Sequence, residues 1–208
     1  QIVNVKQASN FSSFDIKINI PSKKKIIKRI KLPMIGMHNI RNATAAISLA
    51  FTIGLHEKFI KAGIYNFKGV QRRFSHLFDY NNISFYDDYA HHPTEISSVL
   101  SGVEKVYKNK EIVCVFQPHR ISRVISLKKE FSKCFKKADT VLLCPIYAAN
   151  EKLRLNFTYH SFAKLIIKNS NVRLIQVENE LQLQKFIKQN VFGKKIYIGM
   201  GAGSISNW

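Results

Sequence analysis

The sequence predicts an α/β protein whose larger, C-terminal part has a Rossmann-like fold, with a mostly parallel sheet and helices on both faces. Two observations support this fold class. From residue 83 onward, short apolar runs of strand length alternate with amphipathic segments of helix length. Turn-forming residues such as Gly, Pro, Asn and Asp separate these segments along the 208-residue chain.

The individual elements of this part follow from apolar spacing and turn signals. Residues 77–80 and 83–88 are expected to form two strands joined at Asn81 and Asn82, a pair suited to a hairpin turn. Pro93 suits the first turn of a helix over residues 93–106. Further strands are expected at 111–116, 140–144, 172–177 and 194–200, with helices at about 121–137, 158–168 and 180–189.

The first part of the chain has a different pattern. Residues 14–20 alternate apolar and polar side chains, as a half-buried strand does, and residues 26–32 are a second strand candidate. A helix is then expected from Asn39, a candidate cap, to Gly54, which suits a helix end. A shorter helix should follow at about 57–65.

The composition limits the classes of function. The net charge of +20 raises the hypothesis of a nucleic-acid binder. However, lysine is spread along the whole chain, and Lys, Ile, Asn and Phe all have A/T-rich codons, so a solvated lysine surface explains the charge without a partner. No run of about 18 apolar residues occurs, so no membrane span is expected. The three cysteines form no CxxC pair, which indicates a reducing compartment.

Residues 87–95, which read DDYAHHPTE, are the first candidate for chemistry. Two carboxylates end a predicted strand, and two imidazoles precede a helix N-terminus, where free amides favour anions. Three interpretations remain open: a polar functional loop, capping and turn residues, or a metal site. Adjacent histidines diverge, so joint metal ligation by His91 and His92 is disfavoured, and no metal ligand is assigned.

Residues 117–123, which read QPHRISR, directly follow an apolar strand. They bring His119, Arg120 and Arg123 to the carboxyl end of that strand, and a helix starting near residue 120 would place both arginines on one face. Two guanidiniums and an imidazole suit a carboxylate or a phosphate. The alternative is a solvated basic helix start, although uncompensated cations are unfavourable at a helix N-terminus.

Three weaker signals complete the candidate sites. Arg72 and Arg73 could hold a phosphate between domains, although basic linkers are common. Asn39 and Asn42 lie three apart at a helix start, where amides can bind adenine edges, although capping explains Asn39 equally well. Residues 201–205, GAGSI, are similar to a glycine-rich phosphate loop without its lysine, so a tight turn is the preferred interpretation.

Taken together, the segments GMHNIRNA, GVQRRF, DDYAHHPTE, QPHRISR, YAANE and GAGSI, in this order, resemble the Mur ligases of peptidoglycan synthesis. The similarity runs from about Gly36 to the C-terminus, with residues 1–35 fitting loosely. Within the family, DDYAHHPTE followed by QPHRISR most resembles the ligases that join L-alanine to UDP-N-acetylmuramate. The ligases that recycle murein tripeptide resemble this chain at the first of these motifs, and they remain an alternative.

The resemblance implies two domains: the end of a P-loop-type central ATPase domain at residues 1–74, and the Rossmann-like C-terminal domain at 75–208. The family's ATP-binding loop, of the GTHGKT type, does not occur in the sequence, so we expect the C-terminal portion of a ligase, inactive without its N-terminal half. The implied reaction is cytoplasmic and uses ATP and Mg²⁺. The lactyl carboxylate of UDP-N-acetylmuramate becomes an acyl phosphate, which L-alanine attacks. A stand-alone nucleotide- or anion-binding module of the same fold is the alternative.

The resemblance also implies roles for single residues. Asn42 would contact adenine, while Arg73 and Asp88 would contact the ribose and phosphates. Two positions depart from the family pattern: Ser75 stands where Glu is usual, and Asn150 replaces the Gly of YAAGE, which matters if its φ is positive. The residues that would bind substrate at the reacting end are Asn39, Tyr89, His119, Arg120 and Arg123, the last three of them catalytic.

Overall fold

A computed structural model describes residues 1–8, 10–20, 23–152 and 158–208. The chain forms two compact units. The first comprises Gln1–Gly69 with Lys105–Tyr107, and the second comprises Val70–Glu104 and Lys108–Trp208. The division after Gly69 lies a few residues before the boundary expected at residue 74. Among the described residues, no helix combines the length and apolar character needed to cross a membrane.

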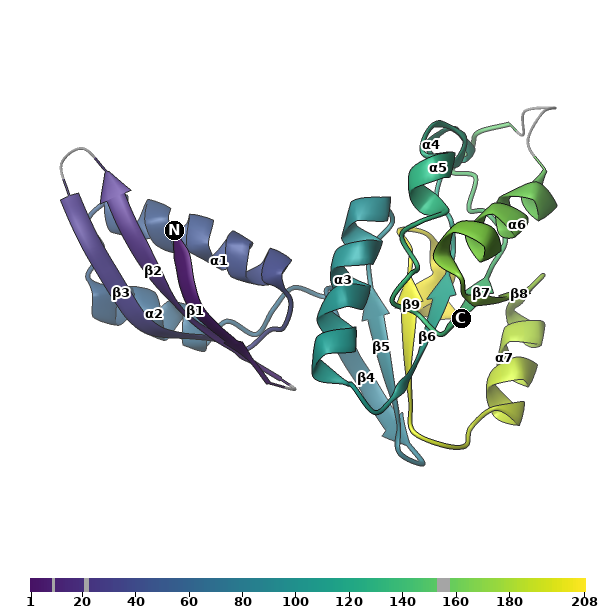
Figure 1. Ribbon diagram of the computed structural model, residues 1–208, viewed down its shortest axis with the longest axis horizontal. Coiled ribbons are helices and arrows are strands. Elements are labelled where there is room, and N and C mark those ends of the chain that lie inside the picture. The colour runs from purple at the N-terminus through teal and green to yellow at the C-terminus, as the bar shows by residue number, and fades with distance from the viewer. Residues whose placement is uncertain (9, 21–22, 153–157) are drawn as a thin grey trace. The chain divides into compact units, whose positions relative to one another are not determined.

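The first unit contains three antiparallel strands and two helices (Figure 1). β1 (Ile2–Gln7), β2 (Ser12–Ile20) and β3 (Lys23–Leu32) pair in that order, followed by α1 (Met37–Thr52) and α2 (Glu57–Tyr65). Phe14 and Ile16 of β2 point to one face of the sheet, because strand side chains alternate, and they share a core with Ile40 of α1 and Ile60 of α2. Both predicted strands and both predicted helices are confirmed. β1 is not among the predicted strands, since its side chains are only partly buried or exposed.

Asp15 fixes an irregularity in both neighbouring strands of this sheet. The β1–β2 register shifts between Val3 and Lys6 of β1. The β2–β3 register shifts between Phe14 and Ile16 of β2, on either side of Asp15. Asn4 and Arg29 both have left-handed backbones, with φ of 55°, as bulge residues commonly do. The Asp15 carboxylate accepts hydrogen bonds from Asn4 Nδ2 and from the Arg29 amide, each at 2.7 Å. The bond from Asn4, followed by that from Arg29, holds the pKa of Asp15 below its usual value.

The second unit is built on a six-stranded sheet in the order β4-β5-β9-β6-β7-β8. β4 pairs antiparallel with β5, and all other pairs are parallel. Asn81 and Asn82 join β4 to β5 with positive φ, as a tight hairpin requires, so the predicted turn is confirmed. The strands are β4 (Ser75–Tyr80), β5 (Ile83–Asp88), β6 (Glu111–Phe116), β7 (Thr140–Leu143), β8 (Arg173–Gln176) and β9 (Lys195–Met200).

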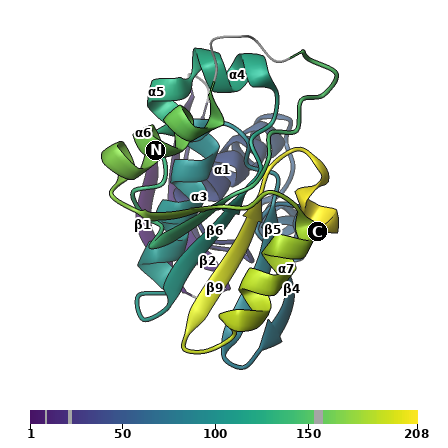
Figure 2. The same ribbon diagram turned by 90° about the vertical axis from the view of Figure 1, so that its right-hand side faces the viewer.

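Helices cover both faces of this sheet, which confirms the predicted fold class. On one face, Val113 and Val115 of β6 share a core with Leu183 of α7 (Glu180–Gln189). On the other face, Phe116 contacts Phe131, which in turn contacts Phe162 of α6 (Tyr159–Ser170). Figure 2 shows α7 on the viewer's side of the strands and α3 (Pro93–Val106) behind them. A short 3-10 helix, η1 (Ser204–Asn207), follows β9.

The single helix expected at residues 121–137 is wrong. The segment forms two short helices, α4 (Ile121–Ser126) and α5 (Lys128–Phe131), followed by turns. The break is at Leu127, whose φ of −109° and ψ of 25° leave the helical region. Phe116 lies against both Phe131 and Phe135, at ring-centroid distances of 5.7 and 5.1 Å. We attribute the break to this packing, which outweighs local helix propensity.

Candidate functional site

The carboxyl ends of four neighbouring parallel strands define the candidate site in the second unit. β5, β9, β6 and β7 are adjacent, and Asp88 pairs with Met200, which in turn pairs with Phe116. The loops that follow these strands therefore begin side by side along one edge of the sheet. They carry the DDYAHHPTE, GAGSI, QPHRISR and YAANE segments, so the sheet brings these motifs together as the strand order requires.

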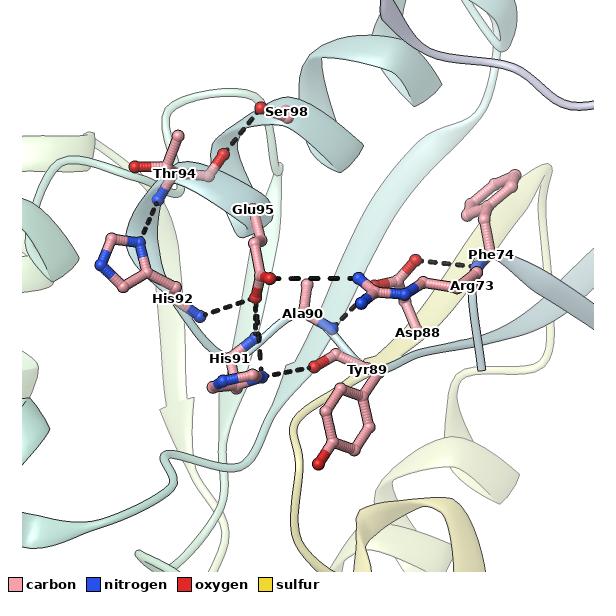
Figure 3. A network of polar contacts seen from close by, with 10 residues as sticks. All are labelled: Arg73, Phe74, Asp88, Tyr89, Ala90, His91, His92, Thr94, Glu95 and Ser98. Atoms are coloured by element: carbon pink, nitrogen blue, oxygen red, sulfur yellow. Dashed lines mark hydrogen bonds and ion pairs between the residues drawn. The ribbon is translucent and has the colours of Figure 1, made fainter. Parts of the chain in front are cut away.

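Asp88 ends β5 and organises the backbone around it (Figure 3). Its Oδ2 accepts a hydrogen bond of 2.8 Å from the Phe74 amide, and its Oδ1 accepts one of 2.7 Å from the Ala90 amide. The side chain is 2% exposed. Burial raises the pKa of Asp88 to about 6, against the lowering effect of the two amides and of Arg73. Asp88 therefore joins the RRF segment to the loop after β5.

Glu95, in the first turn of α3, has the same function on the other side of this loop. Its Oε2 accepts hydrogen bonds from the amides of His91 and His92, at 3.1 and 3.2 Å. Its Oε1 lies 4.0 Å from Arg73 Nη1 (Figure 3). Burial raises the pKa of Glu95, but the His91 amide and the positive charges of His91 and Arg73 outweigh it, so the net shift is downward.

The two histidines have different environments. The His92 side chain caps α3, since its Nδ1 accepts a hydrogen bond of 3.3 Å from the Thr94 amide. The His91 Nδ1 lies 2.9 Å from the Tyr89 carbonyl oxygen and 3.5 Å from Glu95 Oε2. Of the interpretations left open for DDYAHHPTE, capping and turn roles hold for His92 and Glu95. His91 instead lies near the site, with its ring 6.0 Å from that of His119.

Arg72 connects Tyr89 to strand β5 and to the loop after β9. Its carbonyl accepts a hydrogen bond from the Tyr89 amide at 2.6 Å, and its guanidinium lies 5.0 Å from the Tyr89 ring centroid. The same guanidinium donates to Asp87 Oδ2 at 3.2 Å and to the Gly201 carbonyl at 2.6 Å. Arg73 is exposed and its guanidinium also faces the Tyr89 ring, at 5.9 Å. Two arginines thus flank one tyrosine at the end of β5.

The loop after β6 carries the residues that were predicted to bind an anion. His119 stacks on Tyr147, with centroids 5.5 Å apart and an interplanar angle of 8°, and its Nδ1 lies 3.4 Å from Arg123 Nη1. Burial, followed by the charges of Arg123 and His91, lowers the pKa of His119, which favours the neutral imidazole near pH 7. Arg120 is exposed, whereas His119 and Arg123 are half-buried, and both arginines are close enough to affect the charge state of His119. These three predicted residues therefore form one cluster.

Arg120 itself is not helical. Its φ is 67° and it is the N-cap residue of α4, so the expectation that both arginines share one helical face is wrong. The amide and hydroxyl of Ser122 instead donate to the Glu151 carboxylate, at 2.8 and 2.7 Å. A carboxylate at the first turn of α4 compensates the positive charge that is unfavourable there. The positive charge at this helix start is therefore balanced by a carboxylate and not by solvent alone.

The loop after β9 leaves no room for a side chain at two of its positions, Gly201 and Gly203. A β-carbon on Gly203 would lie 2.5 Å from Gln117 Oε1 and 2.7 Å from Tyr147 Cγ, and one on Gly201 would lie 2.7 Å from the Gln117 carbonyl oxygen. Gln117 is buried, and its Oε1 accepts a hydrogen bond from the Ile205 amide at 3.0 Å. These contacts support the tight-turn interpretation of GAGSI.

Asn39 and Asn42 belong to the first unit. The prediction that Asn39 caps α1 is wrong: the N-cap is Gly36, with φ of 95°, and Asn39 lies in the first turn. Its Nδ2 donates to the Ile35 carbonyl at 2.8 Å. Asn42 is exposed. Gly54 has a φ of 92° just beyond the helix, as predicted for a helix end.

Several supporting residues are not among the predicted site residues. Glu95, Gln117, Tyr147 and Glu151 all contact a predicted residue or its loop. For Glu95 the sequence does contain a signal, since an acidic residue in the first helical turn commonly binds preceding amides. For the other three the signal is only their presence within the motifs. Asn150 has a φ of 67°, so the position flagged for its backbone does adopt the left-handed region.

Among the described residues, no group of three or more His, Cys, Asp or Glu side chains could hold an ion. The three cysteines, Cys114, Cys134 and Cys144, are free and buried. Burial raises the pKa of Cys144 to about 12, so its thiol stays protonated.

The profile of the Mur ligase, glutamate ligase domain matches residues 72–191, which is more than half of the chain. The chain belongs to the Mur ligase family. The match begins at the paired arginines and includes the DDYAHHPTE, QPHRISR and YAANE segments, so most of the candidate site lies within the family domain.

Relatives within the Mur ligases extend the similarity to the whole chain. UDP-N-acetylmuramate–L-alanine ligase of Pelagibacter ubique is 60% identical over 208 residues, which cover all of this chain and 45% of that protein. The ligase of the same name in Mesorhizobium japonicum is 35% identical over 210 residues, with the same coverage. The solved UDP-N-acetylmuramate-alanine ligase of Thermotoga maritima is 28% identical, with a TM-score of 0.76, over 99% of this chain and 43% of that one. The chain thus spans less than half the length of these relatives.

Proposed function

We propose that this chain is the C-terminal part of a UDP-N-acetylmuramate–L-alanine ligase of peptidoglycan biosynthesis. The full-length protein would join L-alanine to the lactyl carboxylate of UDP-N-acetylmuramate, with ATP converted to ADP and phosphate. The observation that carries this proposal is the 60% identity, over the entire chain, with a ligase of that name. The conjunction of DDYAHHPTE and QPHRISR supports the same choice.

The loop after β6 supplies the groups that the amide-forming step needs. Attack of an amine on an acyl phosphate develops negative charge on the phosphate and acyl oxygens, which guanidiniums stabilise. We assign this role to Arg120 and Arg123. The lowered pKa of His119 leaves its imidazole able to accept a proton from the attacking amine. Tyr89, flanked by two arginines, would line the same pocket.

The remaining assignments concern the acid substrate and the nucleotide. Asn39 would contact the reacting substrate, and Asn42, which is exposed, would contact adenine. Arg73 is exposed and can reach a phosphate. Asp88 is 2% exposed and uses both oxygens for backbone amides, so a nucleotide contact would use the second lone pair of an oxygen.

ATP and Mg²⁺ are the cofactors of the proposed reaction. Magnesium requires several oxygen ligands in octahedral geometry, and the described residues offer no cluster of three carboxylate or imidazole groups. We therefore assign the protein ligands of Mg²⁺ and the triphosphate loop to the part of the full-length protein outside this chain. Free cysteines and the nucleotide substrates support a cytoplasmic location.

Purified full-length protein tests the proposal. ADP release should require UDP-N-acetylmuramate and L-alanine together, and mass spectrometry should detect the alanylated UDP-sugar. A parallel reaction supplies the murein tripeptide in place of L-alanine. Ligation of the tripeptide without ligation of L-alanine would assign the protein to the recycling ligases instead. A matched variant, Arg123→Ala, should abolish most of the ligation and so exclude a contaminating ligase.

A further inference from the structure

The loop after β7 contacts the loop after β6 through backbone hydrogen bonds, a ring stack and a carboxylate. Tyr147 donates its amide to the Pro118 carbonyl at 2.8 Å, and its own carbonyl accepts from the Arg120 amide at 2.9 Å. The Tyr147 ring stacks on His119. Glu151 then accepts two hydrogen bonds from Ser122. Backbone, ring and carboxylate contacts thus join the two loops.

We propose that Tyr147 and Glu151 are positioning residues for the amino-acid side of the reaction, because they hold His119, Arg120 and Arg123 in place. This inference rests on the proposed function, in which these three residues contact the amine and the acyl phosphate. Neither Tyr147 nor Glu151 needs to touch the substrate. Their effect is transmitted through the QPHRISR loop.

The backbone of Arg120 explains why the loop needs support. A φ of 67° is unfavourable for a residue with a side chain, so neighbouring contacts must hold it. One such contact is the hydrogen bond that the Arg120 amide donates to the Tyr147 carbonyl. The Tyr147 ring stacks on His119, the residue immediately before Arg120, and so fixes the plane of the imidazole ring. Loss of the Tyr147 ring would free His119 to rotate.

The charge of Glu151 supports the arginines. α4 has only six residues and begins between Arg120 and Arg123, where cations oppose the helix dipole. Glu151 places a carboxylate at this end, and the hydrogen bonds from Ser122 followed by the charge of Arg120 lower its pKa. Positive φ at Ala149 and Asn150 forms the turn that brings Glu151 to Ser122.

The loop after β9 also contacts Tyr147 and helps to hold it in place. Gly203 lies against the Cβ and Cγ of Tyr147, so the loop after β9 supports the base of this side chain. Gln117, the first residue of the QPHRISR segment, contacts the same glycine. Three loops from adjacent strands therefore converge on Tyr147, which is why we place it at the centre of the positioning device.

Steady-state kinetics of the full-length protein separate positioning from general destabilisation. Glu151→Ala and Tyr147→Leu should each raise the KM for L-alanine about tenfold, while the KM values for ATP and UDP-N-acetylmuramate stay within about twofold. Tyr147→Phe keeps the ring and should stay near wild type. Glu130→Gln, at an exposed glutamate of α5, is the control and should change no KM. Equal changes in all three KM values, or none, would overturn the proposal.

A second measurement does not depend on ligation. Burial and the charges of Arg123, His91 and Arg120 lower the pKa of His119, and the carboxylate of Glu151 partly offsets this lowering. Glu151→Gln should therefore lower the midpoint of the His119 titration further, as measured by NMR with labelled histidine. If wild-type protein ligates no L-alanine, the proposed function fails, while this titration still tests the positioning claim. An unchanged His119 midpoint would show that Glu151 does not act on this loop. If Tyr147→Leu does not fold, the kinetics of Glu151→Ala and the titration of Glu151→Gln still decide the outcome.

Discussion

Gly203 lies so close to Gln117 that a β-carbon at position 203 would come within 2.5 Å of the Gln117 side-chain oxygen. That oxygen is already occupied, because it accepts a hydrogen bond from the Ile205 amide. The same β-carbon would also meet the base of the Tyr147 side chain at 2.7 Å. The close approach of the loops after β6, β7 and β9 is therefore possible only with glycine at this position.

Substitution of this glycine should destabilise the protein. Gly203→Ala is expected to reduce the free energy of unfolding by about 1–3 kcal/mol, since overpacking displaces Gln117 or Tyr147. Gly63→Ala in α2 is the matched control, because a β-carbon there meets nothing within 4 Å and helical alanine is favoured. Thermal unfolding of both variants decides the matter. Equal melting temperatures would contradict the close approach described above.

The ionisation of Asp88 should make stability depend on pH. Its native pKa of about 6 lies above the ordinary value of 3.8, so the folded protein binds the proton more tightly than the unfolded chain. The contribution to stability is then fully present below about pH 4 and is lost as the pH rises through 6, with a total of about 3 kcal/mol. Carbon-13 NMR of the carboxyl group measures the midpoint. A midpoint below 4 would show that the two amide hydrogen bonds outweigh burial.

Glu95 should stabilise the loop before α3 and slow hydrogen exchange of its amides. Glu95→Ala removes the acceptor for the amides of His91 and His92, at a cost of about 1–3 kcal/mol, and hydrogen exchange at both amides should accelerate. Glu104→Ala, on the same helix, is the control, because it removes an ion pair between Glu104 and Lys137. Both side chains of that pair are nearly half exposed, so its loss should cost less than about 1 kcal/mol. Similar exchange rates in the two variants would rule out the role assigned to Glu95.

Arg123 should affect both the reaction and the neighbouring imidazole. In the full-length protein, Arg123→Ala is expected to reduce kcat/KM by about 10²-fold or more, through loss of a group that stabilises developing charge. The charge of Arg123 lowers the pKa of His119, so the variant should also raise the His119 titration midpoint. Arg173→Ala, at an exposed residue of β8, serves as control for both readouts. A His119 midpoint that does not move would contradict the 3.4 Å contact between the two side chains.

The chain by itself should not catalyse the proposed reaction. It contains no Gly-Lys-Thr or Gly-Lys-Ser segment, and such segments bind the phosphates in P-loop proteins. Residues 1–208 expressed alone should release no ADP above background and should bind ADP only weakly by calorimetry. Circular dichroism verifies that the fragment is folded. ATP-dependent ligation of L-alanine by this fragment would refute the idea that an additional segment is essential.

Much of the fold was predictable from local pattern. The strands over residues 83–88 and 111–116 are short apolar runs, and burial of both faces of a parallel sheet requires this composition. The turn at Asn81 and Asn82 and the helix start at Pro93 follow from backbone preferences of single residues. The candidate residues His119 and Arg123 were also predictable, since position after a strand places them at the sheet edge.

Local sequence pattern was therefore enough to predict the order of the elements and the strand ends that carry polar residues, because these depend on neighbours along the chain. The positive φ of Asn150 came from the structure, since the family resemblance had only marked the position as one where such a backbone would matter. Which loops touch became clear from the three-dimensional fold. Glu151 reaches Ser122, and Gly203 reaches Gln117, across large sequence separations. The fold also shows that the segment divides into two helices at Leu127, while Phe131 and Phe135, which follow the break, pack against Phe116. Such contacts depend on how distant strands pair, which no short stretch of sequence specifies.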